Sequence, residues 1–227
     1  MKKGFLVAVI AVLVSSGVYA IPLSIGGGLV FGTEWTNLNW ENAQVNIRQD
    51  SLGGSVFFDA HFASLSVDLM QGNYNIYADA KTPNGIKDSV IIHSATLVNL
   101  NLVGKFPVPV HGTQTLRFFP MIGVGCQMST AVEDKDTSED IFITNGFNNF
   151  RVLLGLGVDL DLSDLVFIRI SALPYYNVPI VPHTKFATKT AGGDTESVMG
   201  IPSGFGVNGS LSFGFKLGNV PNKQPQN

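Results

Sequence analysis

The chain has 227 residues, of which 14 are Lys or Arg and 17 are Asp or Glu, so that its net charge at pH 7 is −3. This acidic balance argues against nucleic acid as a partner, because binding to phosphate backbones requires clustered positive charge. Its single cysteine permits no internal disulfide, and no stretch approaches the roughly eighteen apolar residues of a transmembrane helix.

The N-terminal region has the layout of a secretory signal peptide. Lys2 and Lys3 are followed by an uncharged apolar run over residues 4–14, and small residues precede Ala20. Signal peptidase recognises small residues at such positions, so we expect cleavage between Ala20 and Ile21. The alternative is a membrane anchor, for which the apolar run is too short. The expected organisation is a signal peptide at 1–20, one barrel domain at 21–217 and a polar tail at 218–227.

The rest of the chain is rich in glycine and shows a two-residue rather than a helical periodicity. Every second residue from Phe150 to Leu162 is apolar, and Arg151, Asp159 and Asp161 lie between them. Such alternation predicts a strand with one apolar face and one polar face. Eight strands are predicted in this way, at about residues 23–31, 56–62, 65–76, 93–106, 115–128, 150–162, 166–172 and 205–217.

The connections between these strands alternate between long and short. Ala63 and Ser64 are expected to form a two-residue turn, and an extra residue near Leu69 is expected to form a β-bulge that turns Tyr74 outward. An even strand number with long loops at one end predicts an all-β, closed, antiparallel up-and-down transmembrane barrel. Eight strands is the expected number, and ten is the alternative if residues 175–189 hide a further hairpin.

The apolar face decides between two kinds of barrel. In a soluble secreted ligand-binding barrel it would fill the interior, whereas in an outer-membrane barrel it meets lipid. Charged residues make up only 14% of the chain and many lie in the loops, so they would form a poor soluble exterior. We therefore expect an integral protein of the cell outer membrane with both barrel termini on the periplasmic side, and the soluble barrel stays open as an alternative.

On this register a set of charged side chains points into the barrel. They are Asp59, Asp68, Lys105, Arg117, Arg151, Asp159, Asp161, Arg169 and Lys216. An eight-stranded barrel is only wide enough for side chains, and an unpaired buried charge is costly. We therefore expect a salt-bridged network rather than an ion-selective pore, in which one sign of charge dominates. All but Arg151 lie near a short turn or the end of the last strand, which predicts closure of the periplasmic half.

The outer half of the interior is expected to form a shallow vestibule that opens outward. Its lining would be small or weakly polar, with Gly26, Gly28, Val30, Asn99, Gly123, Gly125, Leu153, Gly155, Asn208 and Ser210. The alternative is that these glycines only make room for long arginine side chains or for the curvature of the barrel.

Signals for catalysis or for a metal are weak. His61 lies three residues before Ser64 and His93 adjoins Ser94, but no carboxylate is placed to orient either histidine toward a serine. No cluster of His, Cys or carboxylates has the spacing of metal ligands. We therefore expect neither an enzyme nor a cofactor. Aromatic residues near the strand ends are typical of the belts at the two membrane interfaces.

Three segments resemble the small outer-membrane β-barrel superfamily, which includes the OmpX-, OmpA- and OmpW-type proteins. They are FFPMIGVGC at 118–126, LLGLGVDLDL at 153–162 and GSLSFGFKL at 209–217. The resemblance covers most of the chain as a pattern of strands rather than as a residue signature. It implies an eight-stranded barrel inserted by the outer-membrane assembly machinery with periplasmic chaperones. In that family the last strand usually ends the chain on an aromatic residue, whereas here a tail follows Phe215 and Leu217.

Two classes of function follow from this interpretation. One is a structural or surface-interaction role for a monomeric barrel that contacts outer-membrane lipid and meets extracellular ligands through its loops. The other, which the OmpW resemblance implies, is a narrow porin or carrier for small, hydrophobic solutes.

Overall fold

The computed structural model describes residues 22–40, 43–60, 62–82, 85–109, 115–134, 141–143, 149–178, 184–189, 195–200 and 203–217. The expected signal peptide, the polar tail and His61 lie outside the described residues. Within the described ranges, no helix is long and apolar enough to cross a membrane.

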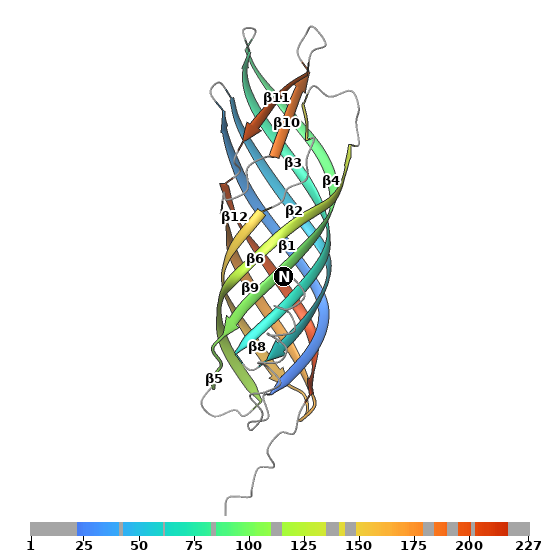
Figure 1. The fold of residues 1–227 in the computed structure, drawn as a ribbon, viewed down its shortest axis with the longest axis vertical. Helices are drawn as coiled ribbons and strands as arrows, with labels where there is room; N and C mark the ends of the chain where they lie inside the picture. Colours follow the sequence, from blue (N-terminus) through green and yellow to red (C-terminus); the bar gives the residue numbers. More distant parts are fainter. Residues whose placement is uncertain are drawn as a thin grey trace, which may run out of the picture.

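Eight long antiparallel strands close into a barrel (Figure 1). They are β1 (Leu23–Trp40), β2 (Ala43–Ala60), β3 (Ala63–Thr82), β4 (Gly85–Lys105), β6 (Leu116–Asp134), β8 (Asn149–Asp161), β9 (Val166–Val178) and β12 (Ser203–Leu217). Each strand pairs with the next in this order, and β12 pairs with β1 to complete the ring. The expected closed all-β barrel of eight strands is confirmed.

Four short strands lie outside this ring. β5 (Val108–Pro109) pairs with β6 near its first residues. A separate three-stranded sheet holds β7 (Ile141–Ile143), β10 (Thr184–Lys189) and β11 (Thr195–Gly200). A hairpin of β10 and β11 does exist, but it pairs with β7 rather than with the barrel, so the alternative of ten barrel strands is not realised.

The pairing register fixes the tilt of the strands. Paired residues followed around the barrel from Leu65 of β3 lead back to β3 at Asn75, ten residues further along. A stagger of ten residues over eight strands gives a tilt of about 40° and a backbone radius of about 8 Å. Each residue then rises about 2.5 Å along the barrel axis. A barrel of this width is filled by its own side chains.

The exterior of the barrel is apolar on every side. Along β8, Leu153 is 1% exposed and the next residue, Leu154, is 65% exposed. All eight strands carry such an exposed apolar side chain, among them Leu29, Leu52, Leu69, Leu102, Ile122, Leu154, Ile170 and Phe213. A ring of outward apolar residues is the lipid-facing band of a transmembrane barrel, which is about 25 Å tall.

The expected β-bulge near Leu69 is wrong. β3 keeps a regular register with both β2 and β4 beyond this residue, so that Gln71 and Asn73 are exposed and Tyr74 is buried. The apolar alternation breaks because the strand leaves the lipid-facing band, beyond which an outward polar side chain meets water. In the described strands the register shifts instead where β4 pairs with β6, next to Leu97.

Several boundaries also differ from the predicted ones. Ala60 pairs with Ala63, so that the chain turns before the expected turn at Ala63 and Ser64. β1 and β2 continue through most of the polar segment between residues 34 and 53, which the sequence predicts as a loop. Strand-pairing hydrogen bonds thus extend well past the apolar residues by which a membrane strand is recognised.

The two ends of the barrel are unlike. We name the end with the short β2–β3 and β8–β9 connections the turn end, and the opposite one the loop end. At the loop end β8 begins at Asn149, opposite Gln127 of β6, while β6 continues to Asp134. β3 and β4 continue further still, and β10 and β11 lie at this same end of the molecule (Figure 1).

Candidate functional site

Four buried charges form the centre of a polar layer near the turn end. Lys105 Nζ lies 2.6 Å from Asp59 Oδ2, and Arg169 Nη2 lies 2.8 Å from the same oxygen. Arg169 Nε also lies 2.7 Å from Asp159 Oδ1. These residues come from β2, β4, β8 and β9, so the ion pairs cross the lumen rather than follow one wall.

The same layer continues toward the turn end through three less buried charges. Arg117 Nη2 lies 2.8 Å from Asp161 Oδ1 and 3.8 Å from Asp159 Oδ2. Lys216 Nζ lies 2.8 Å from Asp161 Oδ2. The side chain of Arg117 is 40% exposed, so this part of the layer reaches solvent. We name these seven residues the turn-end layer.

Arg169 is also enclosed by aromatic rings. Its guanidinium carbon lies 4.4 Å from the ring centre of Phe57, 5.0 Å from that of Phe119 and 5.2 Å from that of Phe167. Cation–π attraction adds to the ion pairs where, as here, the cation is desolvated. The rings fill the lumen around the charge, which leaves the guanidinium little freedom to move.

A second polar layer lies near the loop end, around Arg151, which is 1% exposed. Arg151 Nη2 donates to Glu34 Oε2 at 2.7 Å, and Nε donates to Asn177 Oδ1 at 3.2 Å. Arg151 also donates to Asn99, Gln127 and Tyr175. The members of this loop-end layer come from β1, β4, β6, β8 and β9, so it too crosses the lumen.

The carboxylate of Glu34 is as fully bound as the guanidinium. Tyr175 Oη donates to Glu34 Oε2 at 3.0 Å, and Asn177 Nδ2 donates to Oε1 at 2.7 Å. Thr36 Oγ1 donates to Oε1 at 3.0 Å. Because both charges of the pair have several hydrogen-bond partners, their burial costs less than that of a bare ion pair.

The two layers share no side chain and lie far apart. Asn177, a member of the loop-end layer, is eight residues along β9 from Arg169 of the turn-end layer. At this tilt, eight residues correspond to about 20 Å along the axis. Polar side chains of the described residues therefore bridge the lumen at two separate levels.

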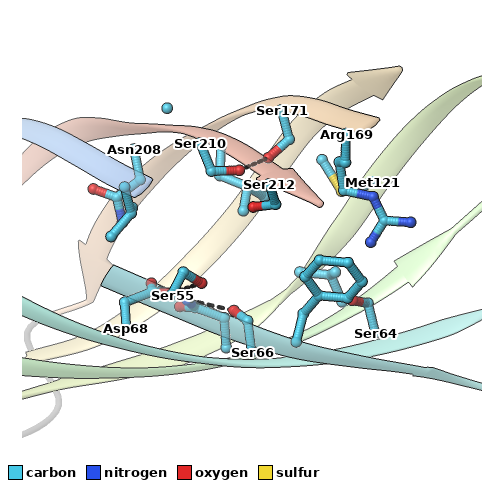
Figure 2. A pocket seen from close by; sticks show the side chains of 16 residues that line it. Ser55, Ser64, Ser66, Asp68, Met121, Arg169, Ser171, Asn208, Ser210 and Ser212 are labelled. Carbon is cyan, nitrogen blue, oxygen red and sulfur yellow. Dashed lines mark hydrogen bonds between the residues drawn. The ribbon is translucent and has the colours of Figure 1, made fainter. Parts of the chain in front are cut away.

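Between the layers lies a small cavity of about 50 Å³, which is lined by both polar and apolar side chains. Ser55, Ser66 and Asp68 line one side of it, and Ser210 and Ser212 face them from the opposite wall (Figure 2). We name this cavity the central chamber. Arg169 lies at one end of it, as Figure 2 shows.

The structure places the nine charged residues named in the sequence analysis in three groups rather than in one network. Seven of them make the turn-end layer, whereas Arg151 belongs to the loop-end layer. Asp68 lines the central chamber and forms no ion pair with a residue of either layer. Sequence reasoning missed Glu34, which it placed in a loop. The inward orientation of Glu34 could have been predicted from the two-residue periodicity of a strand, because Val30, Glu34 and Thr36 lie on one inward face of β1.

The expected open vestibule is wrong for the described residues. Val30, Asn99 and Leu153 are almost fully buried, and the loop-end layer closes the lumen beside them. Inward glycines make room for neighbouring aromatic rings. A Cβ at Gly157 would collide with the ring of Phe119.

The part of the chain that the structure describes has no cluster of the side chains from which zinc or calcium centres are usually built. Those residues contain no group of three or more His, Cys, Asp or Glu that could hold a metal ion. Ser64 is buried, while His61 and the side chain of His93 are outside the described set. What the described interior does chemically is to hold charged side chains in fixed ion pairs.

Comparison with known proteins identifies structures with a similar fold but no related sequence family. No protein-family model matches the sequence, and no curated protein matches it. The structure is similar to the outer membrane protein OprG from Pseudomonas aeruginosa, with a TM-score of 0.54, 12% identity and coverage of 88% of this chain and 98% of that one. This likeness, together with the closed eight-stranded wall, confirms the predicted resemblance to small outer-membrane barrels at the level of fold.

Two further solved structures match less closely. The major outer membrane protein from Thermus thermophilus has a TM-score of 0.45 and 13% identity, with coverage of 83% of this chain and 99% of that one. The outer membrane protease OmpT from Escherichia coli has a TM-score of 0.44 and 9% identity, with coverage of 87% and 97%.

Proposed function

We propose that the protein is a monomeric barrel of the outer membrane that does not conduct solutes and that has a structural or surface-interaction role. The observation that carries this proposal is the closure of the lumen by two polar layers, around Arg169 and around Arg151. A pore of this diameter has no room for a permeant solute beside such layers.

The outer surface supports insertion in a membrane. Leu29, Leu52 and Leu154 are each more than 60% exposed, and similar residues surround the barrel. Removing apolar surface from water gains roughly 25 cal/mol per Å², so a soluble barrel with this exterior would be unfavourable. The exterior therefore gives no support to the soluble secreted alternative. Insertion would require the assembly machinery and chaperones that serve such barrels.

The part of the wall beyond the lipid-facing band supports a role at the cell surface. Thr82 of β3 lies thirteen residues beyond Leu69, the last outward apolar residue of that strand before Gln71. This corresponds to a projection of about 30 Å along the axis. Extracellular ligands would bind to this projecting wall and to the sheet of β7, β10 and β11. We propose no catalytic role for the protein.

A narrow carrier for small solutes has less support. Passage would require Arg151 to leave Glu34 and Arg169 to leave Asp59 and Asp159. Separating a buried ion pair costs several kcal/mol for each pair. Two such steps at separate levels would make transport slow.

Conductance in planar bilayers tests the closed state. We expect no current steps above those of a protein-free membrane, and no swelling of proteoliposomes in sugar solutions. Reproducible steps or swelling would contradict the proposal and favour the carrier. Membrane insertion is tested separately by detergent phase partition, in which recovery in the aqueous phase would contradict it.

A further inference from the structure

One buried carboxylate of the interior lacks the cation that its neighbours have. Glu34, Asp59, Asp159 and Asp161 each have a Lys or Arg nitrogen within 2.8 Å. Asp68 is only 4% exposed, and in the described chain it has no such partner within 4.0 Å. A buried carboxylate without a counter-ion is costly, so its charge must be removed by a bound proton or compensated by a bound cation.

The neighbours of Asp68 are neutral. Ser55 Oγ donates to Asp68 Oδ1, and Asn101 Nδ2 donates to Oδ2 at 2.9 Å. Across the β3–β4 pairing its partner is Asn99, which is also uncharged. These groups orient the carboxylate but do not neutralise it.

The cations of the two adjacent layers are already engaged. Arg151 binds Glu34, and Arg169 binds Asp59 and Asp159. The turn-end layer does contain four cations against three carboxylates. However, it reaches solvent at Arg117, whose side chain is 40% exposed, so water can compensate the excess charge there.

The central chamber offers oxygen atoms and space next to Asp68. Ser55 and Ser66 lie on the same side as the carboxylate, and Ser210 and Ser212 face it across the chamber (Figure 2). A water-sized guest needs about 10–15 Å³ of such volume. The chamber, at about 50 Å³, can therefore hold an ion together with a few water molecules.

We propose that the central chamber binds one alkali-metal cation beside Asp68. Carboxylate, hydroxyl and amide oxygens are the ligands of hard cations. A single carboxylate matches one positive charge, whereas calcium sites usually combine several carboxylates with other oxygens. The ion would be enclosed between the two layers and would act as a structural part of the closed barrel.

Cation-dependent stability of the folded barrel tests this proposal. Thermal unfolding in detergent micelles, followed by heat-modifiable migration, is compared in chloride salts of sodium, potassium and N-methyl-D-glucamine at equal ionic strength. Because a ligand that binds only the folded state stabilises it, we expect a midpoint about 2–4 °C higher in at least one alkali salt, with saturation as its concentration rises. Equal midpoints in all three salts would overturn the proposal.

Two variants separate this site from other effects of salt. Asp68→Asn removes the charge and should abolish the difference between salts. Asp50→Asn removes an exposed carboxylate that pairs with Arg48 on the outer surface, and it should keep the difference. The same difference in Asp68→Asn as in the wild-type barrel would show that the ions act elsewhere, and it would overturn the proposal.

Crystals of the wild-type protein grown in rubidium or thallium salts give an independent test that needs no variant to fold. We expect an anomalous peak in the chamber within about 3 Å of an Asp68 carboxylate oxygen. A chamber without such a peak would overturn the proposal. Conductance of the wild-type barrel would contradict its proposed closed state without bearing on this result.

Discussion

Glu34 and Arg151 are 117 residues apart in the chain, and their side chains form an ion pair of 2.7 Å inside the barrel. β1 carries the first and β8 the second, so no local sequence pattern connects them. The barrel brings them together because its stagger sets which inward positions share one level. The formation of this ion pair therefore depends on the correct closure of the whole barrel.

Replacing Glu34 should destabilise the barrel strongly. In Glu34→Ala, Arg151 would remain buried without its carboxylate, which typically costs about 3–5 kcal/mol. Urea unfolding in lipid vesicles, followed by tryptophan fluorescence, measures this loss.

The matched control is Asp50→Ala, which removes a carboxylate from an ion pair at the outer surface. Arg48 and Asp50 have side-chain exposures of 51% and 43%, so the loss should be under about 1 kcal/mol. Equal losses for the two variants would contradict the assigned importance of the loop-end layer.

Packing of rings over glycine gives a second prediction. A Cβ at Gly157 would meet the ring of Phe119, which is itself held beside Arg169. Gly157→Ala should therefore cost about 1–3 kcal/mol in the free energy of unfolding. In a Phe119→Leu background the same substitution should cost less, because the ring is gone.

Gly54→Ala serves as the control for this cycle. A Cβ there would have only the carbonyl oxygen of Gly28 nearby, at 3.9 Å. Its effect on stability should be small. An equal cost of Gly157→Ala in both backgrounds would show that the ring is not the obstacle.

The sequence predicts well which residues face inward and which face outward. It predicts poorly which inward residues pair with one another in the two layers. Within the lipid-facing band each strand alternates, so that the inward positions of Asp59, Asp159 and Arg169 follow from parity alone. Their pairing depends on the stagger of the closed barrel, and Asp59 and Arg169 are 110 residues apart. Local periodicity carries no information about this stagger.

Glu34 shows why the loop-end layer could not be predicted from the alternation of apolar and polar residues. Beyond the lipid-facing band the outward residues need not be apolar, as Gln71 and Asn73 show on β3. The alternation that marks a membrane strand then disappears while the strand itself continues. Polar sequence there is easily taken for a loop, and inward residues such as Glu34 go unnoticed.

The two layers should act as barriers in series. Arg169→Ala opens only the turn-end layer and Arg151→Ala only the loop-end layer, so each single variant should stay non-conducting in planar bilayers. The double variant should show current steps because both levels are weakened. Arg48→Ala on the outer surface is the control and should leave the barrel closed.

A different result would be informative about which layer closes the lumen. Conduction by one single variant would mean that the remaining layer does not seal, and it would contradict the independence of the two. Folding of each variant is checked beforehand by heat-modifiable migration, so that absence of current is not confused with absence of a barrel.

The depth of the lipid-facing band gives the last prediction. Leu29 points outward from the middle of β1's apolar face and is 62% exposed, whereas Asn73 points outward from β3 beyond the last apolar residue of that face. An arginine near the bilayer midplane costs about 2–4 kcal/mol in a barrel, and one near the interface costs about 0–1 kcal/mol. Leu29→Arg should therefore lower the free energy of unfolding in vesicles by the larger amount, and Asn73→Arg by the smaller. The comparison also tests the regular register of β3, because the bulge expected from the sequence would turn residue 73 inward, where an added arginine would crowd the lumen. A large loss for Asn73→Arg, or a small one for Leu29→Arg, would contradict the placement of the band.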